Sequence, residues 1–116
     1  MSAGVANFCI EQGINWNPTI TWKDSNSVYI ITSGYTADMQ VRAGRNSSAI
    51  LVELSTSNGR ITVTGASGLF SLSLTAAETR ALDFDTGVYD FEVTSAAGIV
   101  YRLLEGNVTL SKEVTR

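Results

Sequence analysis

The chain has 116 residues, of which 44% are hydrophobic and 16% charged, and its formal net charge is −3. This length supports one domain with a real hydrophobic core, and the composition excludes a disordered chain. The basic side chains are scattered singly, which argues against a nucleic-acid or anionic-membrane partner, because phosphate affinity needs clustered cations.

The sequence contains no histidine and a single cysteine. Histidine is the commonest general base and metal ligand, so its absence removes the Ser-His and Cys-His nucleophiles and most metal sites. Cys9 lies in the apolar run Phe8–Ile10, and we expect it to be a small buried residue of the core. No secretory signal and no stretch of about 20 apolar residues is present, so we expect synthesis in a cytoplasm without export.

Two short segments near the start have strand character. Val5–Ile10 predicts an edge strand, and Ile14–Trp22 predicts a strand with an aromatic inner face. Its apolar side is formed by Trp16, Pro18, Ile20 and Trp22, which share one parity. Pro18 cannot donate a ladder hydrogen bond, so we expect this strand at a sheet edge.

The middle of the chain alternates between strands and turns. Tyr35–Arg42 predicts a half-buried strand, Ala43–Ser48 a polar loop and Ala49–Ser55 another strand. Asn58-Gly59 is the strongest hairpin signal, because both residues accept the positive φ of a type I′ turn. We therefore expect Arg60–Thr64 to pair with the strand before it. The side chains expected to face inward are Tyr35, Ala37, Met39, Val41, Ile50, Val52, Leu54, Ile61 and Val63.

The last part predicts a strand, a short helix and a long hairpin. Leu69–Leu74 alternates as a strand does, and in Thr75–Leu82 the spacing of Thr75 and Glu78 is that of a capping box. Thr86–Thr109 then reads as a β-hairpin that turns at Ser95–Gly98. Its first strand places Tyr89, Phe91 and Val93 in the core, and Gly106 predicts a bulge or bend in the second.

Taken together, the pattern predicts an all-β fold. We expect residues 1–116 to form a single antiparallel β-sandwich of about seven to nine short strands, with one helical crossover near 75–82.

Three groups of side chains are candidates for chemistry, and each has a plainer interpretation. Asp83 and Asp85 could bind calcium but are expected to be solvated turn residues. Asp90 and Glu92 could act as glycosidase carboxylates only inside a cleft, and are expected to form the outer face of the hairpin. Trp16 with Tyr29 or Tyr35 could form a sugar-stacking platform, and packing is the alternative.

A series of segments, in order over nearly the whole chain, resembles small Ig-like virion proteins of tailed bacteriophages. The series is also similar to the N-terminal domain of phage upper-baseplate proteins. The segments are Ile10–Gly13, Ile20–Asp24, Gly34–Arg42, Asn58–Ile61, Leu74–Leu82, Gly87–Val93, Arg102–Thr109 and Glu113–Arg116. The sequence departs from that pattern at Ile31-Thr32-Ser33, where such proteins carry an Asp-Leu-Thr-like turn.

The resemblance implies a non-enzymatic, Ig-like structural protein of the virion, without a cofactor and present in many symmetric copies that contact other virion proteins. A neck, tail or baseplate adaptor or fibre anchor is the favoured role. Capsid decoration and a carbohydrate-binding module are the alternatives. Edge strands, loops and a partly free tail at Ser111–Arg116 would make the contacts. The candidate contact residues are Arg102, Glu105, Glu113, Arg116, Arg45 and Asn46.

Overall fold

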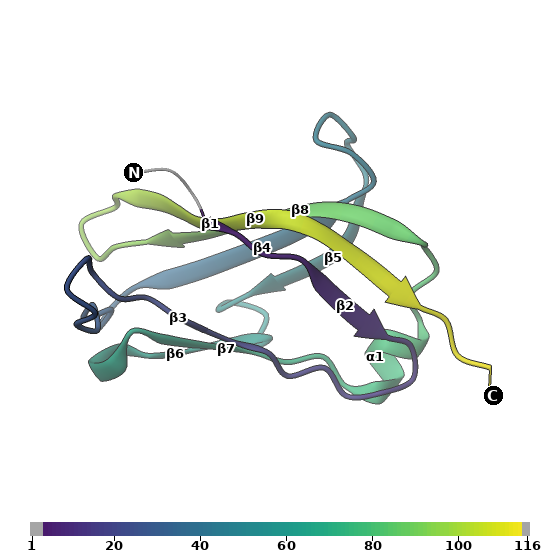
Figure 1. The fold of residues 1–116 in the computed structure, drawn as a ribbon, viewed down its shortest axis with the longest axis horizontal. Helices are drawn as coiled ribbons and strands as arrows, with labels where there is room; N and C mark the ends of the chain where they lie inside the picture. Colours follow the sequence, from purple (N-terminus) through teal and green to yellow (C-terminus); the bar gives the residue numbers. More distant parts are fainter. Residues whose placement is uncertain (1–3, 115–116) are drawn as a thin grey trace.

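The computed structural model describes residues 4–114, which form nine strands, one 3-10 turn and one short helix arranged as two facing sheets (Figure 1). The strands are β1 (Gly4–Val5), β2 (Phe8–Glu11), β3 (Thr19–Thr21), β4 (Thr36–Arg42), β5 (Ile50–Ser55), β6 (Ile61–Thr64), β7 (Leu69–Leu72), β8 (Thr86–Thr94) and β9 (Val100–Ser111). The 3-10 turn is η1 (Gly65–Ser67), and the helix is α1 (Ala76–Arg80). No helix in the described part of the chain is long and apolar enough to cross a membrane.

The strand order is that of an immunoglobulin-like sandwich. The larger sheet runs β1-β9-β8-β4-β5, with β2 also beside β9, and the smaller sheet runs β3-β7-β6. The order β9-β8-β4-β5 corresponds to strands G-F-C-C′ of the immunoglobulin fold, and β3-β7-β6 corresponds to B-E-D. The first strands, β1 and β2, pair in parallel with β9, and within residues 4–114 no strand pairs with the outer side of β3. The expected all-β, Ig-like sandwich is confirmed.

One core fills the space between the sheets. Phe70 of the smaller sheet and Phe91 of the larger sheet are both fully buried, and their ring centroids lie 5.4 Å apart in an edge-to-face arrangement. The other buried apolar residues are Ile10, Ile20, Ala37, Met39, Val41, Val52, Leu54, Ile61, Leu72, Leu74, Tyr89, Val93, Val108 and Leu110. Alternation therefore identified the inner faces of β4, β7 and β8 correctly.

The predicted capping box starts α1. The Thr75 hydroxyl accepts a hydrogen bond from the Glu78 N–H at 3.2 Å, and Glu78 Oε1 accepts one from the Thr75 N–H at 2.8 Å. The helix itself covers five residues only, and it is held by Thr79. This buried side chain accepts from Gly13 N–H and donates to the carbonyl of Ile14, which ties α1 to the segment after β2.

The terminal hairpin is confirmed, but its irregularity is not at Gly106. The register of β8 and β9 shifts between Phe91 and Glu92, where Leu103 is the extra residue. Gly106 pairs regularly with Tyr89. A glycine is needed there for another reason: a Cβ would overlap the carbonyl oxygen of Ala6, where the chain passes from β1 to β2.

The expected hairpin around Asn58-Gly59 is wrong. The strand before it, β5, belongs to the larger sheet, whereas β6 after it belongs to the smaller one. Gly59 has a positive φ of 79° but Asn58 does not, so the turn is not type I′. Asn58 acts through its side chain instead, because its Oδ1 accepts hydrogen bonds from the N–H groups of Ser55 and Arg60 at 3.0 Å each.

Three smaller expectations also fail. Cys9 is exposed, because successive residues of a strand point to opposite faces and its neighbour Ile10 faces the core. Ile50 begins an edge strand beside a register shift and is 43% exposed. The strand expected over Ile14–Trp22 is confined to β3, and Trp16 makes only an isolated bridge to Leu74. The placement of Pro18 at a sheet edge is confirmed, since β3 is an outer strand.

Candidate functional site

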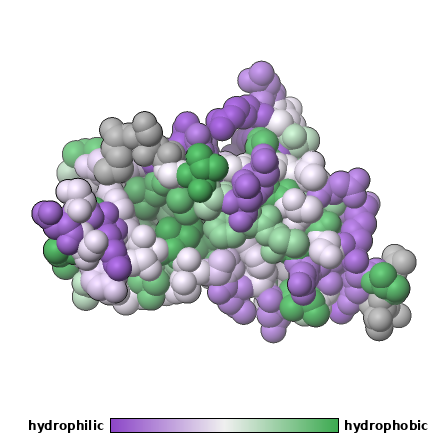
Figure 2. Space-filling model, in the orientation of Figure 1, coloured by the Kyte–Doolittle hydropathy of each residue, from purple (hydrophilic) through white to green (hydrophobic). Residues whose placement is uncertain are grey.

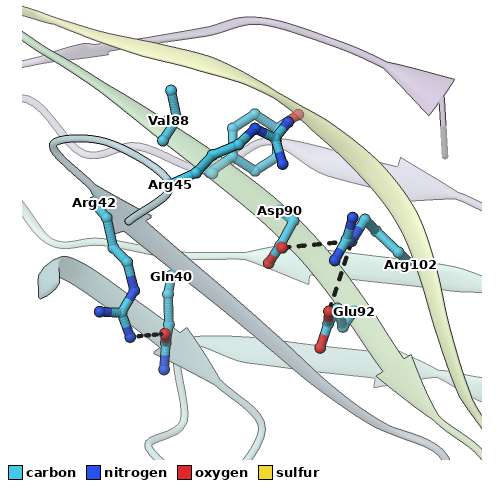
Figure 3. A pocket seen from close by; sticks show the side chains of 8 residues that line it. Gln40, Arg42, Arg45, Val88, Asp90, Glu92 and Arg102 are labelled. Carbon is cyan, nitrogen blue, oxygen red and sulfur yellow. Dashed lines mark hydrogen bonds and ion pairs between the residues drawn. The ribbon is translucent and has the colours of Figure 1, made fainter. Parts of the chain in front are cut away.

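The outward side of the larger sheet carries a cluster of mixed charge, which we call the charged face. It consists of Gln40, Arg42, Arg45, Glu53, Asp90, Glu92, Arg102 and Glu105. Figure 3 shows all of them except Glu53 and Glu105. Three arginines thus stand among four carboxylates. Strands β4, β5, β8 and β9 bring them together because outward positions lie opposite one another across the ladder, as Gln40, Asp90 and Glu105 do.

Arg102 is the centre of this cluster. Its guanidinium lies 3.4 Å from Asp90 Oδ2, 3.7 Å from Glu92 Oε2 and 3.6 Å from Glu105 Oε1. Residues three apart on a regular strand point to opposite faces. The extra residue Leu103 changes this parity, so the bulge in β9 places both Arg102 and Glu105 on the charged face.

The loop between β4 and β5 reaches over the same face. Arg42 donates to the carbonyl of Ser47 and to Gln40 Oε1, each at 2.8 Å. The bond to Ser47 orders the loop, and Arg45 extends from the loop over the sheet (Figure 3). The Arg45 guanidinium lies 3.5 Å from Glu105 Oε1. Its side chain stays 63% exposed, so most of its hydrogen-bond donors are available to another molecule.

Between these side chains lies an open hollow of about 330 Å³. Its floor includes Val88 and Tyr89, and its walls carry charges of both signs. Asp90 and Glu92 lie on the outer face, as the plainer interpretation expected, and they share Arg102 as an ion-pair partner. The arrangement suits polar contact with a protein surface better than the binding of an apolar ligand.

The structure brings together three of the six candidate contact residues, Arg45, Arg102 and Glu105. Asn46 lies in the same loop and is exposed. Glu113 lies elsewhere, and Arg116 is outside the described residues. Gln40 and Arg42 were not among the candidate contact residues, although the alternation of β4 predicted that both face outward.

The C-terminal segment is held to the body at two points. Glu113 accepts from Arg80 Nε at 3.2 Å and donates its N–H to Gln12 Oε1 at 2.8 Å, so this candidate contact residue, in the tail expected to be partly free, is held against the body. Its carboxylate raises the pKa of Arg80. Lys112 lies 3.4 Å from Asp85 and 3.5 Å from Asp83, and these carboxylates raise the pKa of Lys112.

The aromatic side chains do not form the suggested sugar platform. Trp16 packs edge-on against Phe8, whereas Tyr35 packs against Trp22. Trp16 and Trp22 bond to opposite ends of β7 and its extension, and six residues of extended chain separate them by roughly 20 Å. Within residues 4–114 no group of three or more acidic or cysteine side chains is placed to hold a metal ion.

No family model and no curated protein matches the chain. Among solved structures, the chain is similar to the one described in "Parallel homodimer structures of the extracellular domains of the voltage-gated sodium channel beta4 subunit explain its role in cell-cell adhesion". The identity is 15% and the TM-score 0.48, over 98% of this chain and 97% of that one.

Proposed function

We propose that this protein is a non-enzymatic structural component of a tailed-phage virion that binds a neighbouring virion protein through its charged face. The phage assignment is supported by the ordered series of family-like segments in the sequence. The contact surface is supported by the geometry of Arg102, which is held by three carboxylates yet has a side chain 46% exposed. That single observation identifies a polar surface that is already ordered before a partner arrives.

A pre-ordered surface favours binding because less side-chain freedom is lost on contact. Arg45 and Arg102 can each donate hydrogen bonds to a carboxylate of the partner, and Glu92 can accept hydrogen bonds from a basic side chain. Such charge pairs set the orientation of two proteins and exclude wrong partners more than they add affinity. These properties suit an adaptor or fibre anchor in the neck, tail or baseplate. Capsid decoration would use the same contacts.

The virion assignment is tested with purified particles of the phage that encodes the chain. Quantitative mass spectrometry should find the protein at many copies per particle, and its absence from the particles would overturn the proposal. A reconstruction of the particle then locates the copies. A ring at the neck or baseplate supports the adaptor role, whereas a lattice over the capsid supports decoration.

The role of the charged face is tested by Arg102→Gln in the phage genome. We expect fewer copies of the variant in the particles, because the partner loses a charge-assisted hydrogen bond. Lys112→Gln is the matched control, since Lys112 also pairs with two carboxylates and is 49% exposed at the other end of the molecule. Equal incorporation of both variants would contradict the assignment of this face.

A further inference from the structure

The outer edge of β3 is a second surface that the proposed function does not use. In the described part of the chain, β3 pairs only with β7, because β1 and β2 lie against β9 in the other sheet (Figure 1). The backbone of Gly106 permits this arrangement by letting Ala6 pass close to β9. The smaller sheet therefore ends in a strand that has a vacant side.

The hydrogen-bond pattern shows which groups of β3 face the vacant side. The carbonyl of Pro18 accepts from Leu72 N–H, and Trp22 N–H donates to the carbonyl of Gly68, each at 2.9 Å. In an antiparallel ladder alternate residues point to the same side. Thr19 and Thr21 therefore point their N–H and C=O groups away from β7, and no hydrogen bond among the described residues uses these four groups.

Beside this edge lies an apolar cleft of about 180 Å³ between β3 and β9. Its lining residues are Gly4, Ile20, Thr21, Trp22, Lys23, Leu103 and Leu104. Figure 2 shows the corresponding hydrophobic patch on the face turned to the viewer. Leu103 and Leu104 remain only half-buried, so apolar surface stays in contact with water next to unpaired backbone groups.

The outer edge of β5, in the larger sheet, is covered by side chains. The carbonyl of Glu53 in β5 accepts from Arg60 Nη1 at 2.9 Å and from Asn58 Nδ2 at 3.1 Å, and the N–H of Ser55 is bound by Asn58 Oδ1. Side chains thus cover that edge against pairing with other strands. Comparable cover is missing along β3 in residues 4–114.

We infer that the vacant edge of β3 is a pairing surface for β3 of a second copy of this chain. Antiparallel pairing about a two-fold axis at Ile20 places Thr19 opposite Thr21 of the partner subunit, and the reverse. The four free backbone groups of each copy would then be satisfied by those of the other. The two three-stranded sheets would become one continuous sheet, and the apolar clefts would lie next to each other.

The side chains agree with this register. Thr-Thr pairs across antiparallel strands are favourable. Lys23 falls opposite Asn17 of the partner subunit, so no pair of like charges meets. The contact involves a strand of three residues, which makes it small, and small interfaces give weak and transient association. We expect self-association to need a high local concentration of the protein.

The test is sedimentation equilibrium of the full chain over a concentration series up to about 1 mM, a range suited to weak association. The wild type should show a monomer–dimer equilibrium. Thr19→Lys with Thr21→Lys places like charges opposite each other twice and should weaken the dimer about tenfold. Thr19→Lys with Thr21→Glu places opposite charges together and should restore it, with a new sensitivity to salt.

Two further variants separate pairing from general effects. Thr21→Pro removes an N–H that faces the vacant side and should weaken the dimer, whereas Thr21→Val keeps that N–H and should leave it unchanged. Circular dichroism confirms that each variant is folded. A wild type that stays monomeric throughout the series, or a Lys/Glu variant that associates no better than the Lys/Lys variant, would overturn the inference. Arg102→Gln should leave the dimer intact, so this result is distinguishable from failure of the proposed function.

Discussion

Phe70 of β7 and Phe91 of β8 join the two sheets through an edge-to-face contact between rings whose centroids lie 5.4 Å apart. Both side chains are fully buried. The contact lies between the strands that are central in their sheets. Immunoglobulin domains of antibodies join their sheets with a disulfide, and this sequence, with one cysteine, has to rely on packing.

Phe91→Ala should therefore be among the most damaging substitutions in the protein. Truncation of a fully buried phenylalanine costs about 3–5 kcal/mol of unfolding free energy, because apolar contact is lost and a cavity remains. Urea denaturation followed by tryptophan fluorescence measures the effect. Tyr29→Ala, at a side chain that is 49% exposed, is the control and should change stability by less than about 1 kcal/mol. Similar losses in both variants would contradict the role of the ring contact.

Gly106→Ala should separate the first strands from β9. A Cβ at this position would overlap the carbonyl of Ala6, a backbone group that cannot move cheaply, and would come within 2.9 Å of the side-chain oxygen of Asn7. We expect a loss of about 1–3 kcal/mol, as for other overpacked sites. Hydrogen exchange should show reduced protection for residues 4–11. Gly44→Ala, where nothing lies within 4 Å of the added atom, is the matched control.

The stability of the protein should fall in alkaline solution through Tyr89. Burial raises the pKa of Tyr89 to about 12 from 10.0, and its hydroxyl donates to the Ala6 carbonyl at 2.6 Å. Between these two values the unfolded chain has lost the proton that the folded chain retains, so stability declines as the pH rises from 10 to 12. Tyr89→Phe should be less stable near neutral pH, by about 1 kcal/mol, with a shallower decline in this range. Parallel curves for the two proteins would rule out this linkage.

Glu78 should contribute to stability at neutral pH and lose that contribution in acid. Hydrogen bonds from the Thr75 backbone and from Arg60 lower the pKa of Glu78 below its ordinary 4.5. A lowered pKa means that stabilisation is fully present above 4.5 and is lost as the pH falls through the lower, folded-state value. Glu78→Ala also removes the capping box, which costs about 1 kcal/mol. Thermal unfolding at pH 7 and pH 3 measures both effects, and the difference from wild type should be larger at pH 7.

Cys9 should react quickly with a thiol reagent in the native protein, because its side chain is exposed on β2. The rate should rise by less than about tenfold when the chain is unfolded in urea, since native access is already open. Cys9→Ser is the blank for the assay. Slow native labelling that accelerates steeply on unfolding would place the thiol in the core and contradict the structure.

Hydrophobic alternation was enough to predict most of the core. The prediction of strand pairing failed where it depended on one local turn signal. Asn58-Gly59 marks a turn correctly, but a turn does not determine whether the next strand joins the same sheet. Here the chain crosses to the other sheet. Cys9 was misplaced for a similar reason, because an apolar run of three residues conceals which of them faces inward.

The charged face was predictable in part. Alternation already directed Asp90, Glu92 and Arg42 outward. The position of Arg102 beside Glu105 depends on the extra residue at Leu103, and nothing in the surrounding sequence distinguishes that leucine from a regular strand residue. Bulges are set by the packing of neighbouring strands, so this part of the site needed the three-dimensional structure.

The parallel pairing of β2 with β9 also sets a constraint on when the protein can fold. Cys9 is paired with Thr109 and Phe8 with Val108, so β2 can join the sheet only after β9, 100 residues further along the chain (109 − 9), has left the ribosome. Until then, Ile10 and Phe8 have no sheet to join. Native pairs so distant in sequence raise the contact order and slow folding to the millisecond-to-second range that is typical of β-sandwiches. The larger sheet is therefore completed only after nearly all of this sequence has been synthesised.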